Sequence, residues 1–171
     1  MKRYVLTGGP CAGKTTVLEI LKKRGFSVVP EAARDIIEKN TANGGDVLPW
    51  KNLQKFQDTT VWIQFWRELF SKPYGILFLD RGIVDPVGYC AVFTANVPKI
   101  TRWFGRNRYE KIFLLDLLPD YMADESRKED REMAKLIHEE LRKGYISYGY
   151  EVIQVPFLTP EERVEFILRS L

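Results

Sequence analysis

Cysteine and histidine are scarce in this sequence, and each shortage excludes a class of protein. The two cysteines, Cys11 and Cys90, are too few for the disulfide framework that stabilises many secreted domains. The single histidine, His138, has no cysteine or second histidine beside it, so the ligand spacing of a zinc site is missing. We therefore expect a reduced, intracellular protein without a histidine-based metal site.

Long hydrophobic runs and a strong excess of one charge are also missing. No segment approaches the roughly 18 uninterrupted apolar residues of a membrane-spanning helix. Glycine follows Met1–Thr7 before the apolar part of a secretory signal could be complete. Lysine and arginine number 26 against 23 aspartates and glutamates, a net charge of +3 that is too small for a dedicated nucleic-acid-binding protein. We expect a cytoplasmic protein that binds neither membranes nor nucleic acids.

Short apolar runs do alternate with longer helical patterns along the 171 residues, a length that suits one domain. This alternation is typical of an α/β fold in which helices cover both faces of a parallel sheet. One helix is predicted over Lys14–Arg24, another over Asn52–Phe70, a third carries Met133 and Tyr148, and the last begins at Thr159. The predicted strands are Tyr4–Thr7, Ser27–Pro30, Gly75–Leu79, Lys111–Leu115 and Glu151–Val155.

The most specific signal is a glycine-rich phosphate-binding loop that follows the first predicted strand and opens the first predicted helix. Its glycines let successive main-chain N–H groups converge on phosphate oxygens. The lysine brings a positive charge to the β- and γ-phosphates, and the following threonine offers a hydroxyl to Mg²⁺. We therefore predict that ATP and Mg²⁺ are bound by Gly8, Gly9, Pro10, Cys11, Ala12, Gly13, Lys14, Thr15 and Thr16.

Such a loop needs an acidic partner for Mg²⁺ at the end of a neighbouring strand. Asp80 and Asp116 each follow a predicted strand. Polar residues, among them Arg81 and Asp85, gather after Asp80, whereas leucines follow Asp116. The polarity of this edge favours Asp80 as the magnesium ligand, with Asp116 as a residue that caps a turn.

The order of these motifs resembles that of a known group. The sequence is similar to the small P-loop kinases related to the ribosylnicotinamide-kinase domain of the bacterial NAD-biosynthesis regulator, also described as AAA-type ATPases. More distantly it resembles nucleoside and nucleoside-monophosphate kinases. The resemblance covers most of the chain and rests, besides the loop, on the segments Val29–Arg34, Phe78–Gly82 with Asp85, Asp124–Arg127 with Glu129 and Asp130, and Gly149–Pro156.

The resemblance implies a P-loop NTPase fold of three layers within a single domain of residues 1–171. Its five-stranded parallel sheet would have the order 2-3-1-4-5, with helices on both faces. It also implies a small arginine-bearing lid over about residues 120–132, in which Arg127 and Arg131 meet the transferring phosphate. The alternative is that these two arginines belong to an exposed, salt-bridged helix start.

The resemblance also assigns roles around the acceptor. Glu31 would accept the proton of the acceptor hydroxyl or help to hold magnesium. Arg34 would bind the acceptor or orient Glu31, although a Glu31–Arg34 pair that fixes the turn is a structural alternative. Arg81 and Asp85 fit either acceptor binding or support of neighbouring side chains. Five aromatic residues fit either the pocket wall or the core: Phe56, Trp62, Phe65, Trp66 and Phe70.

Together these features favour an ATP- and Mg²⁺-dependent kinase that phosphorylates a small nucleoside- or nucleotide-like acceptor. A nucleotide-dependent regulatory ATPase or switch is the main alternative, but the sequence has no Asn-Lys-x-Asp segment to recognise guanine, and Arg81 rather than glutamate follows Asp80. A third reading, an RNA-processing kinase, would use the basic and aromatic segment Lys99–Lys111.

Overall fold

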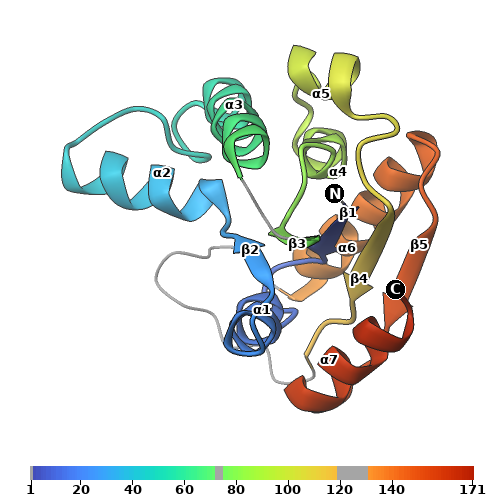
Figure 1. Ribbon diagram of the computed structural model, residues 1–171. Coiled ribbons are helices and arrows are strands. Elements are labelled where there is room, and N and C mark those ends of the chain that lie inside the picture. Colours follow the sequence, from blue (N-terminus) through green and yellow to red (C-terminus); the bar gives the residue numbers. More distant parts are fainter. Residues whose placement is uncertain (1, 72–74, 119–130) are drawn as a thin grey trace.

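A five-stranded, all-parallel sheet organises the computed structural model, which describes residues 2–71, 75–118 and 131–171 (Figure 1). The strand order β2-β3-β1-β4-β5 confirms the predicted order 2-3-1-4-5. All five predicted strands are present, with ends shifted by no more than two residues. They are β1 (Lys2–Thr7), β2 (Ser27–Val29), β3 (Ile76–Asp80), β4 (Lys111–Leu115) and β5 (Val152–Val155).

Both faces of the sheet are buried, because successive apolar residues of a strand point to opposite faces. In β1, Tyr4 and Leu6 point into one hydrophobic cluster, and Val5 points into the other. Helices α1 (Lys14–Lys23) and α7 (Pro160–Arg169) pack on the first face. The second face is covered by α3 (Leu53–Phe70), α4 (Asp85–Phe93) and α6 (Arg131–Ser147). The result is the predicted three-layer P-loop NTPase fold.

The predicted helices are found close to their predicted ends. Asn52 caps α3 by accepting a hydrogen bond from the Lys55 amide, and Thr159 with Glu162 forms the capping box of α7. Two further helices, α2 (Ala32–Ala42) and α5 (Lys99–Phe104), complete the fold. In Figure 1, α2 projects to the side of the sheet, whereas α5 lies beside α3. Within the described ranges, no helix has both the length and the apolar character needed to cross a membrane.

The parallel arrangement brings the carboxyl ends of the strands to a single edge of the sheet. The glycine-rich loop leaves β1 there, Glu31 follows β2, and Asp80 closes β3. Because β1 lies between β3 and β4, the loop is central and has Asp80 on one side and Asp116 on the other. Segments far apart in the sequence therefore meet at this edge.

Candidate active site

The glycine-rich loop adopts a backbone that side chains would hinder. Gly8 and Gly13 have φ angles of +143° and +76°, in the region that favours glycine. A Cβ atom on Gly8 would lie 2.7 Å from the main-chain oxygen of Leu115, so the loop can approach β4 only with glycine there. Cys11, with φ of 58°, also adopts a left-handed conformation. The loop motif thus has the backbone curvature that a phosphate cradle requires.

Lys14 opens α1 and turns its side chain back over the loop. Its Nζ donates to the main-chain oxygens of Gly8 and Gly9, at 3.1 Å each. The ammonium group is buried, which places a positive charge among the amides of the loop at the N-terminal end of the helix. Thr15 and Thr16 follow it and are exposed. The amides of the loop, the ammonium group of Lys14 and the N-terminal end of α1 all favour the binding of an anion at the loop.

His138 lies behind the loop, a placement that sequence reasoning missed. Its Nδ1 accepts a long hydrogen bond of 3.5 Å from the Gly9 amide. Burial lowers the pKa of His138, and the charge of Lys14 lowers it further, while Asp116 and Glu139 act in the opposite direction. The neutral imidazole is thus a neighbour of the loop.

Asp80 carries an unpartnered oxygen at the end of β3. Its Oδ1 is buried and accepts no hydrogen bond from any described residue. Burial and the negative charge of Glu31 raise the pKa of Asp80 to about 6, although Lys14 and Arg81 act to lower it. A buried carboxylate oxygen without a partner fits a divalent cation, because Mg²⁺ prefers oxygen ligands and would supply the missing counter-charge. Asp116 differs, since its Oδ1 accepts a hydrogen bond of 2.7 Å from Gln154.

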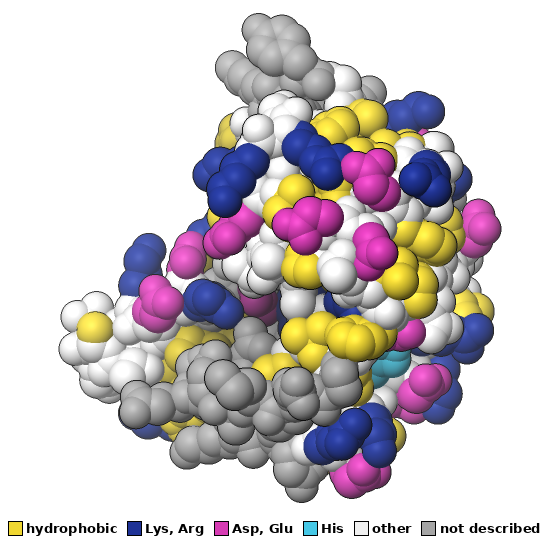
Figure 2. All heavy atoms as spheres, turned by 90° about the horizontal axis from the view of Figure 1, so that it is seen from below, with side chains coloured by type: hydrophobic (Ala, Val, Ile, Leu, Met, Phe, Trp, Pro, Cys, Tyr) yellow, Lys and Arg dark blue, Asp and Glu magenta, His cyan; other side chains and the backbone are white. Residues whose placement is uncertain are grey.

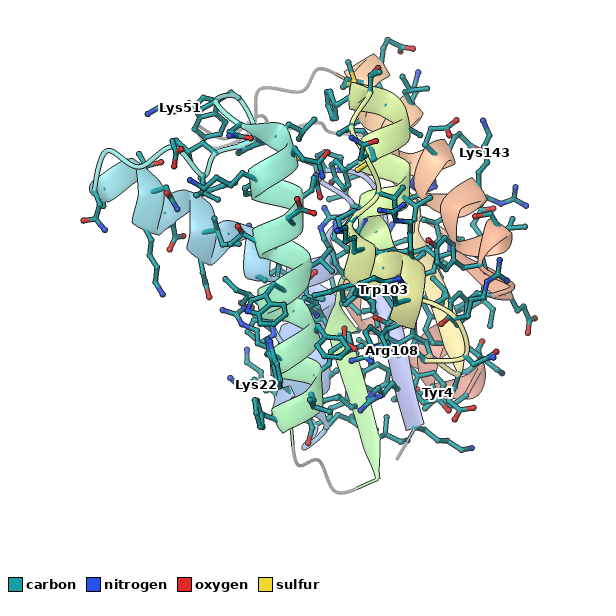
Figure 3. All side chains as sticks on the ribbon, turned by 90° about the horizontal axis from the view of Figure 1, so that it is seen from above. Tyr4, Lys22, Lys51, Trp103, Arg108 and Lys143 are labelled. Carbon is teal, nitrogen blue, oxygen red and sulfur yellow. The ribbon has the colours of Figure 1, made fainter. Side chains whose placement is uncertain are left out.

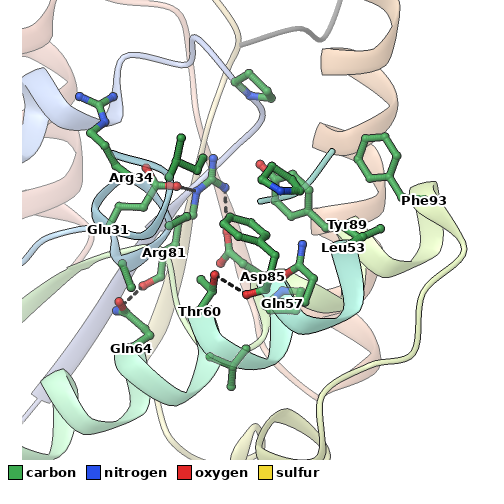
Figure 4. A pocket seen from close by; sticks show the side chains of 18 of the residues that line it. Glu31, Arg34, Leu53, Gln57, Thr60, Gln64, Arg81, Asp85, Tyr89 and Phe93 are labelled. Atoms are coloured by element: carbon green, nitrogen blue, oxygen red, sulfur yellow. Dashed lines mark hydrogen bonds and ion pairs between the residues drawn. The ribbon is translucent and has the colours of Figure 1, made fainter. Parts of the chain in front are cut away.

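Arg81 joins two carboxylates from different elements (Figure 4). Its Nε donates to Glu31 at 2.8 Å, and its Nη1 donates to Asp85 at 3.0 Å. Arg81 itself has φ of 67°, a strained conformation that aims the guanidinium group back across the sheet edge. Glu31 is thus oriented by Arg81, 50 residues away, whereas the exposed Arg34 points away from Arg81 in Figure 4.

Asp85 is buried and its two oxygens receive four hydrogen bonds. Oδ2 accepts from Thr7 Oγ1 at 2.8 Å and from Arg81, while Oδ1 accepts from the Gly82 amide at 3.0 Å and from the Tyr145 hydroxyl. Of the two roles considered for Asp85, this geometry favours support of neighbouring groups over contact with an acceptor. The carboxylate connects β1, the turn after β3 and α6.

The hydrogen bonds around Asp85 can be tested by removing the hydroxyl of Tyr145 on α6. We expect Tyr145→Phe to lower the free energy of unfolding by about 1–2 kcal/mol, because Asp85 loses a buried donor. Burial raises the pKa of Tyr145, so the hydroxyl keeps its proton at neutral pH. Tyr148→Phe, directly after the same helix, is the matched control, because the Tyr148 hydroxyl bonds to no described residue. Equal urea midpoints for the two variants would contradict the supporting role.

A cavity of about 590 Å³ opens beside these groups. Pro10 of the loop and the ends of β2 and β3 border it, and α2, α3 and α4 form its walls. Its volume lies within the range of small-molecule sites. The polar lining includes Glu31, Arg34, Glu38, Gln57, Thr60, Gln64, Arg81, Asp85 and Tyr89, and the aromatic lining adds Trp50, Phe56 and Phe93.

Two glutamines of α3 have unmet hydrogen-bonding capacity in this cavity. Gln57 is buried, and its amide forms no hydrogen bond with a described residue. Gln64 donates to the main-chain oxygen of Arg81, but its Oε1 is buried and has no partner in the described part of the chain. Both stand on the inner face of α3, where the sequence pattern alone predicts apolar residues; this break in the pattern is the signal that could have identified them.

Of the two roles considered for the aromatic residues of α3, the pocket wall applies to one of them. Of the five aromatic residues considered, only Phe56 lines the cavity. Trp62 and Phe70 are exposed on the outer side of α3, and Phe65 and Trp66 are half-buried. The 3.6-residue repeat of α3 produces two apolar stripes, of which only the inner one faces the site.

The lid prediction falls mainly outside the described residues. Arg127 and most of the range 120–132 are not among them, while Arg131 is the exposed first residue of α6. The basic segment Lys99–Lys111 is partly engaged elsewhere: Arg108 bonds to Glu68, and Lys111 to the main-chain oxygen of Ser170. On the face shown in Figure 2, basic and acidic side chains are interspersed rather than gathered by sign.

Comparison with known proteins supports the fold. The model of an AAA domain family matches residues 3–163. Deoxyadenosine kinase from M. mycoides is 16% identical with a TM-score of 0.69, and the match covers 98% of this chain and 97% of that one. NadR bound to NAD and AMP-PNP is 21% identical with a TM-score of 0.72, over 98% of this chain and 49% of the NadR chain.

Shikimate kinase from Aquifex aeolicus is 20% identical, with a TM-score of 0.58 and coverage of 98% and 95% of the two chains. No match was found among curated protein sequences. The chain spans about half the length of NadR. The family match and these structures confirm the predicted resemblance to small P-loop kinases.

Proposed function

The chain belongs to the AAA domain family, and from this premise we propose that it is an ATP- and Mg²⁺-dependent kinase of a small nucleoside- or nucleotide-like acceptor. One observation carries the proposal: the phosphate-binding loop, Asp80, whose Oδ1 has no partner among the described residues, and the carboxylate of Glu31 lie at one sheet edge, beside a cavity of about 590 Å³. A phosphoryl donor and an acceptor could therefore meet there.

At the donor end, the loop from Gly8 to Thr16 would hold the triphosphate. Its amides and the ammonium group of Lys14 would neutralise the charge that spreads over the transferring phosphoryl group. Thr15 and Asp80 would hold Mg²⁺, which would offset the negative charge of the phosphates. Arg127 and Arg131 would add cations from the segment before α6. The exposure of Thr15 and of Arg131 is compatible with contact to a bound nucleotide.

At the acceptor end, Glu31 would accept the proton of the attacking hydroxyl. The hydroxyl oxygen forms a bond to the γ-phosphorus while the bond from that phosphorus to ADP breaks, and the proton passes to the carboxylate. The ion pair with Arg81 holds Glu31 in place at the mouth of the cavity. Arg34, on the rim, would contact the outer part of the acceptor.

The cavity lining supports an acceptor with a planar, hydrogen-bonding ring. Phe56, Tyr89 and Phe93 supply aromatic surface, and the buried Gln57 offers an amide donor and acceptor on the same side chain. A nucleobase or a similar heterocycle presents both kinds of group along one edge. Such a ring would satisfy the amide that the described residues leave unpaired.

We expect Gln57→Leu to lower kcat/KM for the acceptor by about tenfold to hundredfold while ATP affinity is retained, because a buried hydrogen-bonding contact is lost. Gln54→Leu is the matched control, since Gln54 lies on the same helix and bonds to Asn96 outside the cavity lining. Steady-state kinetics with varied acceptor provide the measurement. An unchanged KM and kcat in Gln57→Leu would contradict this role.

The proposed activity is tested by incubating purified protein with ATP, Mg²⁺ and a panel of nucleosides, nucleotides and other small alcohols. Mass spectrometry should show one acceptor that gains a single phosphate, together with stoichiometric ADP. ATP hydrolysis that is independent of every acceptor, and is accelerated by a protein partner, would instead favour a regulatory ATPase. The cavity beside the loop favours the kinase, because a switch needs no acceptor pocket.

A further inference from the structure

An exposed aromatic surface covers the outer side of α3 and α5, on the side of α3 that faces away from the cavity. We call it the aromatic face and define it by Trp62, Trp66, Leu69, Phe70, Trp103 and Phe104. Figure 3 shows α3 and α5 side by side at the front of the view, with Trp103 on α5. No described element of the chain lies over them in this view. The surface is therefore open to a partner.

Ring contacts join most of this face, from Trp62 and Phe70 on α3 to Phe104 on α5. Along α3, the Trp62 and Trp66 ring centroids are 5.4 Å apart, and Trp66 stacks on Phe70 at 5.3 Å. Phe65 connects the two helices, because its ring lies 5.8 Å from that of Trp66 and 5.1 Å from that of Phe104. The patch is thus a packed aromatic layer rather than a scatter of single exposed residues.

The exposed area approaches what a stable dimer requires. Trp62 is 53% exposed, Phe70 72%, Trp103 71% and Phe104 48%. With about 150–250 Å² for a fully buried aromatic side chain, these fractions correspond to roughly 500 Å² of exposed ring surface. That is near the upper limit for the largest apolar patch of a monomer and would form most of the roughly 800 Å² that each partner buries in a standard interface.

Among the described residues, the charged side chains within the face are engaged inside the chain, and the Arg108 guanidinium lies 4.7 Å from the centroid of the Phe65 ring. The charged residues of α3 between Thr59 and Phe70 are Arg67 and Glu68, and these bond to Asp35 and Arg108 respectively. Asp58, one helical turn before Trp62, and Arg102, next to Trp103 in the chain, are exposed and carry opposite charges. An aromatic centre with few charges and a rim of both signs is typical of protein–protein interfaces.

We propose that the aromatic face pairs with the same face of a second copy of this chain, so that the protein forms a two-fold symmetric dimer through α3 and α5. A two-fold pairing lets an acidic rim residue of one subunit meet a basic rim residue of the other, because each contact occurs twice. Nucleic acid fits less well, since Arg108 and Lys111 are bound within the chain and Arg106 stacks on Tyr148.

Sedimentation equilibrium tests the proposal from about 1 to about 100 µM, where homodimers of modest affinity assemble. The unmodified chain should reach the mass of a dimer. Trp103→Glu should raise the dimer dissociation constant at least about thirtyfold, because a largely exposed aromatic residue of the proposed interface is replaced by a charge. Phe157→Glu is the control, since Phe157 is 55% exposed and precedes α7, which packs on the opposite face of the sheet.

Tryptophan fluorescence gives a second measurement that needs no variant. Three of the four tryptophans, Trp62, Trp66 and Trp103, belong to the aromatic face. Dilution of the unmodified chain should therefore shift its emission to longer wavelength as these indoles become hydrated. A monomer at every concentration overturns the proposal, as does a dimer that survives both Trp103→Glu and Trp62→Glu. A monomer that binds single-stranded RNA with steep salt dependence would assign the face to nucleic acid instead.

Discussion

Lys14→Ala is expected to lower phosphoryl transfer by on the order of 10²–10³-fold, because one preorganised charge that meets the developing negative charge is lost. In the structure this ammonium group is buried and bonded to the Gly8 and Gly9 oxygens, 3.1 Å from each. The same substitution should weaken ATP binding, since the cation also faces the bound triphosphate. Steady-state kinetics and calorimetric titration with a non-hydrolysable ATP analogue measure the two effects.

Lys22→Ala is the matched control for this experiment. Lys22 lies on the same helix as Lys14, two turns further along, and its side chain is exposed. The control removes one positive charge from α1 at a position that does not border the loop, so it should leave kcat and ATP affinity near those of the unmodified chain. Full activity of Lys14→Ala would refute the proposed triphosphate site.

Asp80→Asn should lower Mg²⁺-dependent turnover by about 10²–10³-fold, because the cation loses a charged oxygen ligand at the reacting phosphates. Asp80 is the acidic residue at this edge whose Oδ1 is buried without a partner among the described residues. Asp116→Asn is the matched control, since the Asp116 side chain already accepts a hydrogen bond from Gln154. A larger loss in Asp116→Asn would transfer the magnesium role to that residue.

The carboxylate of Asp80 should also make the activity depend on pH. Its pKa is raised to about 6, mainly by burial and by the charge of Glu31. Below that pH a proton occupies the group and competes with Mg²⁺, so activity should fall as the pH is lowered. Higher Mg²⁺ should move the fall to lower pH, because cation and proton compete for one site. A pH profile that does not respond to Mg²⁺ would contradict the assignment.

Without Mg²⁺, the free energy of unfolding should decrease as the pH rises, whereas the activity should increase. The folded Asp80 has a higher pKa than the 3.8 of the unfolded chain, so between these values the folded state binds more protons. Its contribution to the free energy of unfolding therefore decreases as the pH rises toward about 6 and stays low above it. Asp80→Asn should raise the Tm at about pH 7.5 but change it little below about pH 3, where Asp80 is protonated in both states.

The phosphate-binding loop could be recognised from sequence because its parts are contiguous. The glycines shape the backbone of one short segment that also carries the lysine and the threonine. The spacing of these residues in the sequence therefore indicates the geometry of the loop. The five strands were also predictable, since each is a nearly continuous apolar run. By contrast, α4 has the segment Asp85–Phe93, which is apolar almost throughout and shows no helical alternation. Its helical state depends on burial against α6, which the local pattern does not reveal.

The amino-acid sequence by itself determined the loop, the strands and the acidic residues that end them, because each depends on neighbours in the chain. Only the tertiary structure decided that Arg81 pairs with Glu31 and that Asp85 is enclosed by Thr7 and Tyr145. Only it decided that Gln57 faces the cavity while Trp62 faces outward. These contacts join residues from different strands and helices, and their partners are selected by packing across the sheet edge rather than by spacing along the chain.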